Sequence, residues 1–496
     1  MAALPALTAR LVDALGPDAV VTNEAARRTY ECDGLTHYRV TPGVVALPTD
    51  AAGVQATVRL CREYGVPFVA RGSGTGLSGG ALPVADGVLI VTSRMRRILE
   101  VDLANGRALV EPGVVNLAIS QAVADAGYFY APDPSSQIVC SIGGNVAENS
   151  GGAHCVKYGF TVHHVTGLEL CTPDGDLVWL GGGMAAEAPG YDLVGVVVGS
   201  EGTLGIATKV AVRLLRSPQA VTTLLAAFPT IAEAGAATSA IIAAGLVPAA
   251  AEIMDALAIA AAEKAVNCRY PPGAGAVLIV ECDGPAAEVA AEVAEVTRLC
   301  REAGAFEVRV AADPAERAEI WRGRKSAFAA VGRISPNYIV QDGVIPRTAL
   351  AEVLAAIEAL TAEARRRTGH DVRVANVFHA GDGNLHPLVL YDAAVPGFYE
   401  AAEEVSGAIL DLCVAHGGSI TGEHGVGVDK AAKLPRMFGP DDLDTMHLVR
   451  CAFDPDSRAN PGKVFPTPRL CGEVPRPRSA DDDAARAAER LGIEAW

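Results

Sequence analysis

The sequence predicts an α+β fold of roughly two to four domains, in which helices pack on several sheets. At 496 residues the chain is too long for one ordinary hydrophobic core. Half of the residues are hydrophobic and 20% are charged, which is typical of a soluble globular chain rather than a disordered or fibrous one. Strand-like apolar runs alternate with segments of helical periodicity along most of the chain, which favours helices packed on sheets.

Charge and cysteine content disfavour several classes of partner and cofactor. The formal net charge of −17 disfavours nucleic acid or an anionic membrane surface as a partner, because both attract basic patches. Eleven cysteines are scattered without a Cys-x-x-Cys pair, which predicts unpaired thiols in a reducing cytoplasm and no iron–sulfur cluster on this chain. No signal peptide is expected, and the uncharged run 234–251 predicts a packed helix and a turn rather than a transmembrane segment.

Helices and strands alternate in the first 215 residues. The predicted helices are residues 4–15, 49–64 and 114–126, and the predicted strands are 66–70, 87–92, 98–103, 107–111 and 206–215. Three glycine-rich regions, 71–80, 132–152 and 192–205, interrupt this pattern. Glycine density of this kind predicts backbone packed closely on a ligand, with long surface loops as the alternative.

The first of these regions resembles a nucleotide-binding loop. Residues 74–79 match the dinucleotide fingerprint G-x-G-x-x-G, and a strand precedes them. The strand-like segment 87–92 follows where the fingerprint requires a helix. Successive backbone N–H groups can still line a nest for phosphate oxygens. The loop therefore predicts a pyrophosphate site outside a Rossmann fold, with a flexible turn as the alternative.

A smaller unit begins after Ser217-Pro218. From Thr222 the pattern is a strand, an Ala-rich helix and a further series of segments: strand 276–282, helix 286–303 and strand 306–311. This alternation predicts a ferredoxin-like antiparallel sheet with helices on one face. The next helix, 314–331, carries four residues that the spacing alone assigns to a solvated basic face: Trp321, Arg322, Arg324 and Lys325.

A candidate metal site lies between His379 and His386. Asp382-Gly383 predicts a tight hairpin turn, which places His379 directly across from His386 with first side-chain carbons about 5 Å apart. Two polar residues at a loop edge are the alternative interpretation. Glu423, downstream in Gly-Glu-His-Gly, supplies a carboxylate that completes a His-His-Glu set and leaves a coordination position open.

Six motifs, taken in order, resemble a known family. They are 71–83, 143–152, 199–205, 379–386, 422–425 and 460–463. Their order is similar to that in FAD-linked oxidases of the vanillyl-alcohol oxidase type, in the branch of D-lactate dehydrogenases and glycolate oxidase FAD subunits, which includes D-2-hydroxyglutarate dehydrogenases.

The resemblance implies a domain organisation. A two-part, non-Rossmann FAD-binding domain (1–218) would be followed by a ferredoxin-like substrate or cap domain with the metal site (219–425). A helical C-terminal segment (426–470) would dock back on the FAD-binding domain, ahead of a tail (471–496).

The resemblance also assigns residues to FAD, which this branch usually binds non-covalently, although His154 and Cys155 stand in a region where some relatives attach flavin. The positions that would line the cofactor are Arg71, Gly72, Ser73, Gly74, Thr75, Gly76, Ser78, Gly79, Pro132, Ser135, Ser136, Gly143, Gly144, Asn145, Gly152, Glu201, Gly202 and Asn460.

The implied reaction is oxidation of a small D-2-hydroxy acid, glycolate or D-lactate, to the 2-oxo acid. Arg324, three residues after a Trp, would bind the substrate carboxylate. Zinc or manganese on His379, His386 and Glu423 would contact the substrate hydroxyl, and His424 would act as general base. Leu388 stands where dicarboxylate-oxidising relatives have Asn, which disfavours 2-hydroxyglutarate.

Two other functions stay open, as do the partners. A metal-dependent hydrolase would explain the His-His-Glu set but not the glycine-rich first half, and a non-catalytic or partner-dependent FAD subunit is the second alternative. Electrons must leave to an external acceptor, for which the resemblance suggests an iron–sulfur partner subunit. A homodimer, and a cytoplasmic location with peripheral contact to the inner membrane through partners, complete the expectations.

Overall fold

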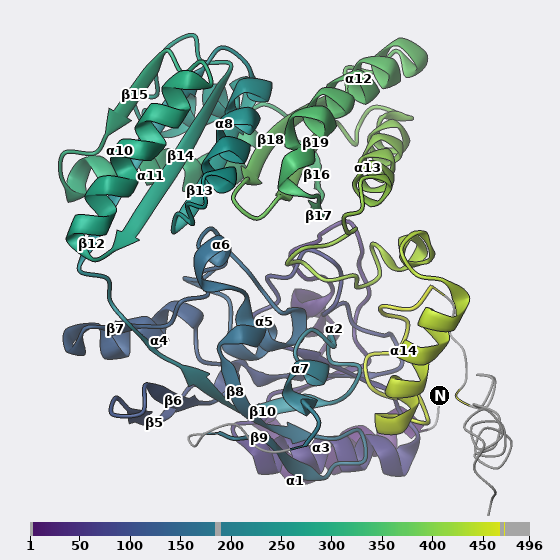
Figure 1. Cartoon of the computed structure of the whole chain (residues 1–496). Coiled ribbons are helices and arrows are strands. Elements are labelled where there is room, and N and C mark those ends of the chain that lie inside the picture. Colours follow the sequence, from purple (N-terminus) through teal and green to yellow (C-terminus); the bar gives the residue numbers. More distant parts are fainter. Residues whose placement is uncertain (1–2, 184–189, 467–470, 472–496) are drawn as a thin grey trace, which may run out of the picture.

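The computed structural model describes residues 3–183, 190–466 and 471, arranged in two lobes (Figure 1). The lower lobe contains residues 3–216 of the described chain together with the C-terminal segment, and the upper lobe contains residues 220–415. The chain crosses between the lobes after β11 (Leu215–Arg216) and enters β12 (Ala220–Phe228). The predicted domain limits stay predictions, and the tail 471–496 lies outside the described residues except for Cys471.

The lower lobe holds a small sheet that presents the first glycine-rich loop. Its order is β1 (Val20–Val21), β2 (Val44–Ala46), β4 (Val88–Val91) and β3 (Phe68–Arg71). Helices α1 (Ala3–Leu15) and α3 (Ala51–Tyr64) pack beside it. β3 runs parallel to β4, and the loop between them contains no helix. This loop therefore departs from a Rossmann fold, as predicted.

A second, antiparallel sheet completes the lower lobe. Its order is β5 (Ile98–Asp102), β6 (Arg107–Val110), β10 (Ile206–Arg213), β8 (Val165–Cys171) and β9 (Leu177–Gly181). The helix α4 (Asn116–Val123) lies within the predicted 114–126. The two later glycine-rich regions hold short helices as well, namely α5 (Ile142–Glu148), α6 (Cys155–Tyr158) and α7 (Leu193–Val197). The remaining short elements of the lobe are α2 (Glu24–Arg27) and β7 (Tyr128–Phe129).

The upper lobe is built on one eight-stranded antiparallel sheet. Its first half is ferredoxin-like, as predicted, with the order β15 (Glu307–Val310), β12, β14 (Ala276–Gly284) and β13 (Ala250–Asp255). Its second half is a similar unit with the order β18 (Arg373–His379), β19 (Asn384–Tyr391) and β16 (Asn337–Val340), and β17 (Gly343–Val344) also pairs with β19. The two halves join edge to edge through β13 and β18.

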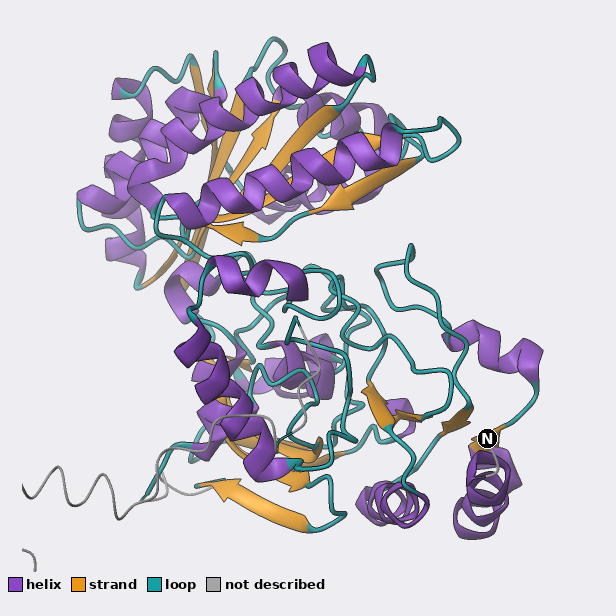
Figure 2. Cartoon of the chain, turned by 90° about the vertical axis from the view of Figure 1, so that its right-hand side faces the viewer, coloured by secondary structure: helices purple, strands orange, loops and turns teal. Residues whose placement is uncertain are grey.

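Helices cover both faces of this sheet, so the expectation of helices on one face was wrong (Figure 2). The first face packs against α8 (Ile231–Ala243), α10 (Ala286–Glu302), α12 (Leu350–Thr368) and α13 (Phe398–Ala415). The second face packs against α9 (Ala256–Val266) and α11 (Pro314–Val331). The reason is visible in β14, where consecutive residues from Val277 to Val280 are all buried. A strand that is apolar at both parities requires cover on both sides.

The uncharged run 234–251 forms part of α8, a turn and the start of β13, as expected. Over the described part of the chain, no helix combines the length and the apolar character needed to cross a membrane.

The C-terminal segment returns to the lower lobe, as predicted (Figure 1). After α14 (Pro440–Phe453), the backbone of 458–460 pairs with the start of β3 through Phe68 N to Arg458 O (2.9 Å) and Asn460 N to Phe68 O (2.8 Å). The Asn460 side chain donates to the carbonyl oxygens of Gly80 (2.9 Å) and Glu201 (2.6 Å). One side chain thus links the C-terminal segment to two glycine-rich regions.

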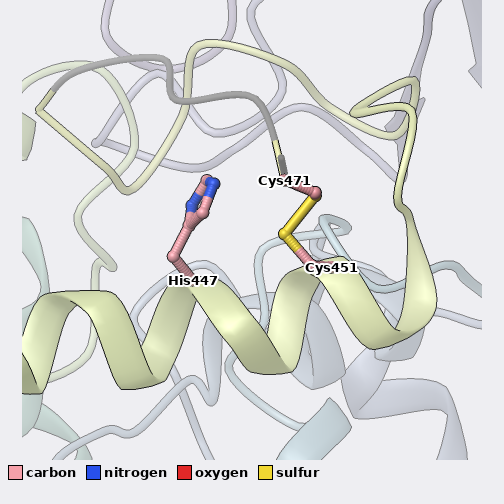
Figure 3. Close-up of side chains that lie close together, drawn as sticks. All are labelled: His447, Cys451 and Cys471. Atoms are coloured by element: carbon pink, nitrogen blue, oxygen red, sulfur yellow. A yellow bond between two sulfur atoms is a disulfide. The ribbon is translucent and has the colours of Figure 1, made fainter. Parts of the chain in front are cut away.

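The expectation of only unpaired thiols was wrong. Cys451, on α14, forms a disulfide with Cys471, beside His447 (Figure 3). The two residues are 20 positions apart in sequence, with Cα atoms 5.6 Å apart. Only the return of the chain past the end of α14 brings them together, so cysteine spacing could not predict the pair. The nine other cysteines are free.

A charged seam joins the lobes at His154. Its Nδ1 lies 2.6 Å from Asp133 Oδ2 in the lower lobe, and its Nε2 lies 3.1 Å from Glu281 Oε1 on β14. Arg317 donates two hydrogen bonds to the Glu281 carboxylate, each 2.8 Å long. Burial lowers the pKa of His154, but the two carboxylates outweigh burial and raise the pKa to about 10.

The seam predicts a pH-dependent stability. Because the pKa of His154 is raised from its ordinary value of 6.5 to about 10, its contribution to the free energy of unfolding is full below pH 6.5 and is lost as the pH rises toward 10. The difference in unfolding free energy between the native protein and His154→Phe, measured by urea titration, should therefore shrink across this interval. A difference that stays constant from pH 6 to pH 10 would contradict a charged His154.

Candidate active site

The hairpin between β18 and β19 brings the two histidines together in a register that the sequence did not predict. His379 pairs with Asn384 and Val377 pairs with His386, so the predicted direct pairing of the histidines was wrong by two positions. Gly383 has a positive φ (+81°), whereas Asp382 does not, so a two-residue type I′ turn cannot form and the loop has four residues. Because side chains alternate with period two, both histidines keep the same face. Their ring centroids are 5.0 Å apart.

The edge pairing of β13 with β18 orients the first histidine. It places Glu252 opposite His379, and the His379 Nδ1 lies 2.7 Å from Glu252 Oε1. Glu252 is ionised, since Arg324 and His379 outweigh the burial that raises the pKa of its carboxyl group and hold that pKa below its ordinary value. Nδ1 therefore carries the hydrogen, and Nε2 points to Glu423 Oε1 at 3.5 Å.

The second histidine is oriented in the same way by a backbone carbonyl. His386 Nδ1 donates to Gln341 O at 3.2 Å, which directs Nε2 to Glu423 Oε1, also at 3.2 Å. Both imidazoles thus present Nε2 to one carboxylate. One ligand atom from each of His379, His386 and Glu423 lies within 4.8 Å of the others.

This triad could hold a divalent cation. His379 and His386 are 3% and 1% exposed, and His379 Nε2 and Glu423 Oε2 are buried without a hydrogen-bond partner. Buried polar atoms are rarely left unsatisfied, and such groups indicate a missing ion or ligand. Burial raises the pKa of Glu423, but the two histidines outweigh it and hold that pKa well below its ordinary value. Two imidazole nitrogens and a carboxylate suit zinc or manganese.

Two buried carboxylates hold the loop that carries Glu423 and His424. Asp342, from the upper lobe, accepts backbone N–H groups of Gly422 (2.9 Å), Glu423 (3.0 Å) and His424 (2.8 Å). Glu201, from the lower lobe, accepts the N–H groups of residues 426 and 427, both at 2.7 Å. The loop is therefore fixed to both lobes. Sequence reasoning missed Asp342, because no local pattern marks it.

His424 lies beside the triad in a neutral state. Its ring stacks on that of His386, with centroids 5.0 Å apart and planes 17° apart. Burial lowers the pKa of His424 to about 4, with Asp342 opposing the shift and His386 and Lys430 adding to it. A neutral imidazole at pH 7 can accept a proton from a bound molecule.

These groups open into a central chamber of about 880 Å³ between the lobes. Its upper wall includes His386, Glu423 and His424, and side chains that sequence reasoning did not assign to the site, Lys325, Phe328 and Tyr338. Its lower wall includes four of the residues predicted to bind the cofactor, Thr75, Gly76, Ser135 and Ser136.

Arg324 does not line this chamber. It is 4% exposed and its Nε donates to Glu252 Oε2 at 2.7 Å, so it belongs to the group that orients His379. The neighbouring Lys325 does line the chamber. Leu388 is fully buried in the core beneath α11 and is not among the lining residues. The substrate roles drawn from Arg324 and Leu388 remain predictions.

A second cavity, the glycine-lined cavity, adjoins the chamber within the lower lobe. Predicted cofactor positions that line it are Arg71, Gly72, Ser73, Gly74, Gly76, Gly143, Gly144, Glu201 and Gly202. Ser78, Gly79, Pro132, Asn145, Gly152 and Asn460 lie outside both linings. Asn145 instead accepts a hydrogen bond from Asn116 (3.0 Å) and Asn460 supports the wall through Gly80 and Glu201. His154 and Cys155 line neither cavity.

Comparison with known proteins identifies the family. Residues 217–464 match the family described as FAD linked oxidases, C-terminal domain, and residues 42–181 match the FAD binding domain. The chain is 51% identical to the glycolate oxidase subunit GlcD of Escherichia coli (strain K12) over 444 residues, which are 90% of this chain and 88% of the relative. The chain belongs to the FAD-linked oxidases. This confirms the resemblance found in the motifs.

Other relatives of this FAD-linked oxidase support the same placement. It is 31% identical to a D-lactate dehydrogenase of Anaerostipes hadrus over 459 residues, which cover 91% of this chain and 95% of the relative. Its fold matches that of p-cresol methylhydroxylase with a TM-score of 0.78 at 17% identity, over 94% of this chain and 97% of the other. The predicted two-part FAD-binding architecture with a separate antiparallel lobe is thus confirmed.

The buried ion pair of Glu252 and Arg324 generates a stability prediction. Glu252→Ala should lower the free energy of unfolding by about 3–5 kcal/mol, because it leaves a buried guanidinium without its partner. The matched control is Glu295→Ala, which removes an exposed partner of Arg298 and should change the free energy of unfolding far less, because solvent screens that pair. Urea denaturation measures both. Equal losses in the two variants would contradict the role of Glu252 as a buried counter-ion.

Proposed function

We propose that this FAD-linked oxidase oxidises a small 2-hydroxy acid, glycolate or D-lactate, to the corresponding 2-oxo acid. The observation that carries the proposal is the adjacency of the two cavities. His386 and Glu423 of the triad, together with neutral His424, face a chamber that shares its wall with the glycine-lined cavity. Relatives named as a glycolate oxidase subunit and as a D-lactate dehydrogenase support this substrate class. A metal-dependent hydrolase would leave the glycine-lined cavity without a use.

The glycine-lined cavity fits FAD. Eight of its lining residues are glycine, and glycine without Cβ lets a ligand approach N–H groups closely. Arg71 contributes a cation whose Nη1 donates to Cys32 O at 2.6 Å, which holds the guanidinium in place. When bound, FAD supplies the two-electron acceptor that no side chain can replace. We infer non-covalent binding, because His154 and Cys155 line neither cavity.

The triad fits a divalent metal, zinc or manganese. His379, His386 and Glu423 would hold it, since each offers a ligand atom and two of these residues keep a buried atom without a partner. When bound, the ion supplies a Lewis acid for the substrate oxygen. Asp342 keeps Glu423 and His424 at their positions through the loop backbone.

A residue of this chain can accept the proton that the substrate hydroxyl loses. His424, neutral at pH 7, would take the hydroxyl proton of the substrate on its ring nitrogen as the carbinol C–H bond gives up its hydride. The substrate loses two electrons and two hydrogens and becomes the 2-oxo acid. Phe328 and Tyr338 line the same chamber.

The substrate carboxylate requires a cation, for which the chain offers two neighbouring residues. Arg324 is the position that the family resemblance suggests, and its Nε and Nη2 lie 2.7 and 2.6 Å from Glu252 Oε2. Lys325 lines the chamber. We propose that Arg324 binds the carboxylate and that Lys325 raises the local positive potential.

Electrons must pass from this chain to an external acceptor. We propose a partner subunit, because the E. coli relative is named as a subunit of glycolate oxidase, and an iron–sulfur cluster on that partner is what the family resemblance suggests. Such a partner would account for a peripheral position at the inner membrane, and a homodimer is the simplest assembly of the chain itself.

The decisive experiment uses flavin absorbance. The purified protein should be yellow. Glycolate or D-lactate, added without oxygen, should bleach the visible absorbance of the bound flavin within seconds. L-lactate is the control for the stereospecificity of the site. Bleaching by neither acid, in a protein that carries FAD and is bleached by dithionite, would refute the proposed substrate class.

The division of work between His424 and the triad is testable separately. His424→Asn should lower kcat by about a hundredfold or more, because the proton acceptor is lost, while metal content stays unchanged. His386→Asn should instead lose the metal. Metal content is measured by mass spectrometry after dialysis, and loss of metal from His424→Asn would contradict the proposed roles.

A further inference from the structure

Glu148 stands in the wall that separates the two cavities. Among the residues that the structure describes, only Gly76 and Glu148 line both the glycine-lined cavity and the central chamber, and of these two only Glu148 has a side chain. It is the last residue of α5, and Asn149 after it adopts a positive φ (+53°) that ends the helix. The mechanism above gives this residue no task.

The fold makes room for this carboxyl group at two glycines. A Cβ at Gly80 would lie 2.4 Å from Glu148 Oε1, and a Cβ at Gly425 would lie 2.1 Å from Glu148 Oε2. Gly425 belongs to the loop that carries Glu423 and His424, and Gly80 lies in the wall of the glycine-lined cavity. The carboxyl group therefore lies between the wall of the glycine-lined cavity and the loop that carries Glu423 and His424.

Glu148 differs from its acidic neighbours in its hydrogen bonds. Glu201 accepts two backbone N–H groups at 2.7 Å, and Asp33 accepts those of Leu35 (3.0 Å) and Ala81 (3.4 Å). No donor in the described residues binds Glu148, and its Oε2 is buried. A carboxylate that has a buried oxygen and no donors, beside two other carboxylates, is costly, whereas the neutral acid is not.

The charges around Glu148 also favour its neutral form. Burial, followed by Glu201 and Asp33, raises the pKa of Glu148 well above its ordinary value, against the opposing charge of Lys430. A carboxyl group that stays neutral at pH 7 has an O–H that can donate a hydrogen bond, as in enzymes that keep an aspartic acid protonated in an apolar site.

We propose that Glu148 contacts bound FAD and acts as a neutral hydrogen-bond donor to the flavin, stabilising its reduced form. Reduction adds negative charge to the flavin, so a donor at this wall binds the reduced flavin more tightly than the oxidised one. Hydrogen bonds to charged groups are the stronger ones, and such a bond changes an equilibrium constant by about tenfold or more. The inference rests on FAD binding alone and not on the substrate proposed above.

The test is a potentiometric titration of the FAD-loaded full chain. Glu148→Met and Glu148→Ala remove the donor and should lower the equilibrium constant for two-electron reduction about tenfold, which corresponds to a midpoint potential about 30 mV more negative. Glu148→Gln keeps a neutral donor of the same length and should change that constant less than about threefold. Chemical reductants are used, so the result does not depend on glycolate or D-lactate.

Two results would overturn the proposal. A higher potential in Glu148→Gln would mean that the native group is an ionised carboxylate rather than a donor. An unchanged potential in both Glu148→Met and Glu148→Ala, with FAD bound as tightly as in the native protein, would mean that Glu148 only packs between the lobes. The FAD dissociation constant, measured by fluorescence, separates weaker binding from a changed potential.

Discussion

The geometry of the site depends on one strand pairing, that of β13 with β18. The upper sheet has two halves with similar strand arrangements, and this antiparallel edge joins them. The pairing sets Glu252 opposite His379, and Glu252 in turn holds Arg324 from the helix above. Without this register, the first imidazole would have no partner for Nδ1 and no reason to direct Nε2 toward Glu423. The pairing of the two halves of the sheet has thus placed Glu252, which orients His379 of the candidate metal centre.

Four carboxyl groups around the site have different roles because their partners differ. Glu252 is balanced by a guanidinium and an imidazole, so it remains ionised in a fully buried position. Asp342 and Glu201 accept backbone N–H groups from one loop and tie it to opposite lobes. Glu148 has no such partners, and this difference is what favours its neutral form. An acidic chain can therefore enclose many acids at its centre when each has a suitable environment.

The loop of residues 422–427, which is held by Asp342 and Glu201, couples the lobes at the site. Residues 422–424 are bonded to the upper lobe and residues 426 and 427 to the lower lobe. A change in the lobe arrangement would therefore move Glu423 and His424 relative to the hairpin histidines. The seam at His154 and the return of Asn460 to Gly80 and Glu201 restrict such movement from two other directions.

The sequence by itself determined the fold class, the three glycine-rich regions, the ferredoxin-like unit and the set of His379, His386 and Glu423, because periodicity, glycine density and motif order are local or ordered along the chain. Only the tertiary structure decided the hairpin register, the cover on both sheet faces, the Cys451–Cys471 pair and the partners of Arg324. It also revealed Asp342, which no motif marks, and Glu148, which lies inside the motif 143–152 but received no role there. The physical reason is that each of these depends on contacts between segments distant in sequence, for which neither spacing nor residue type gives a local signal.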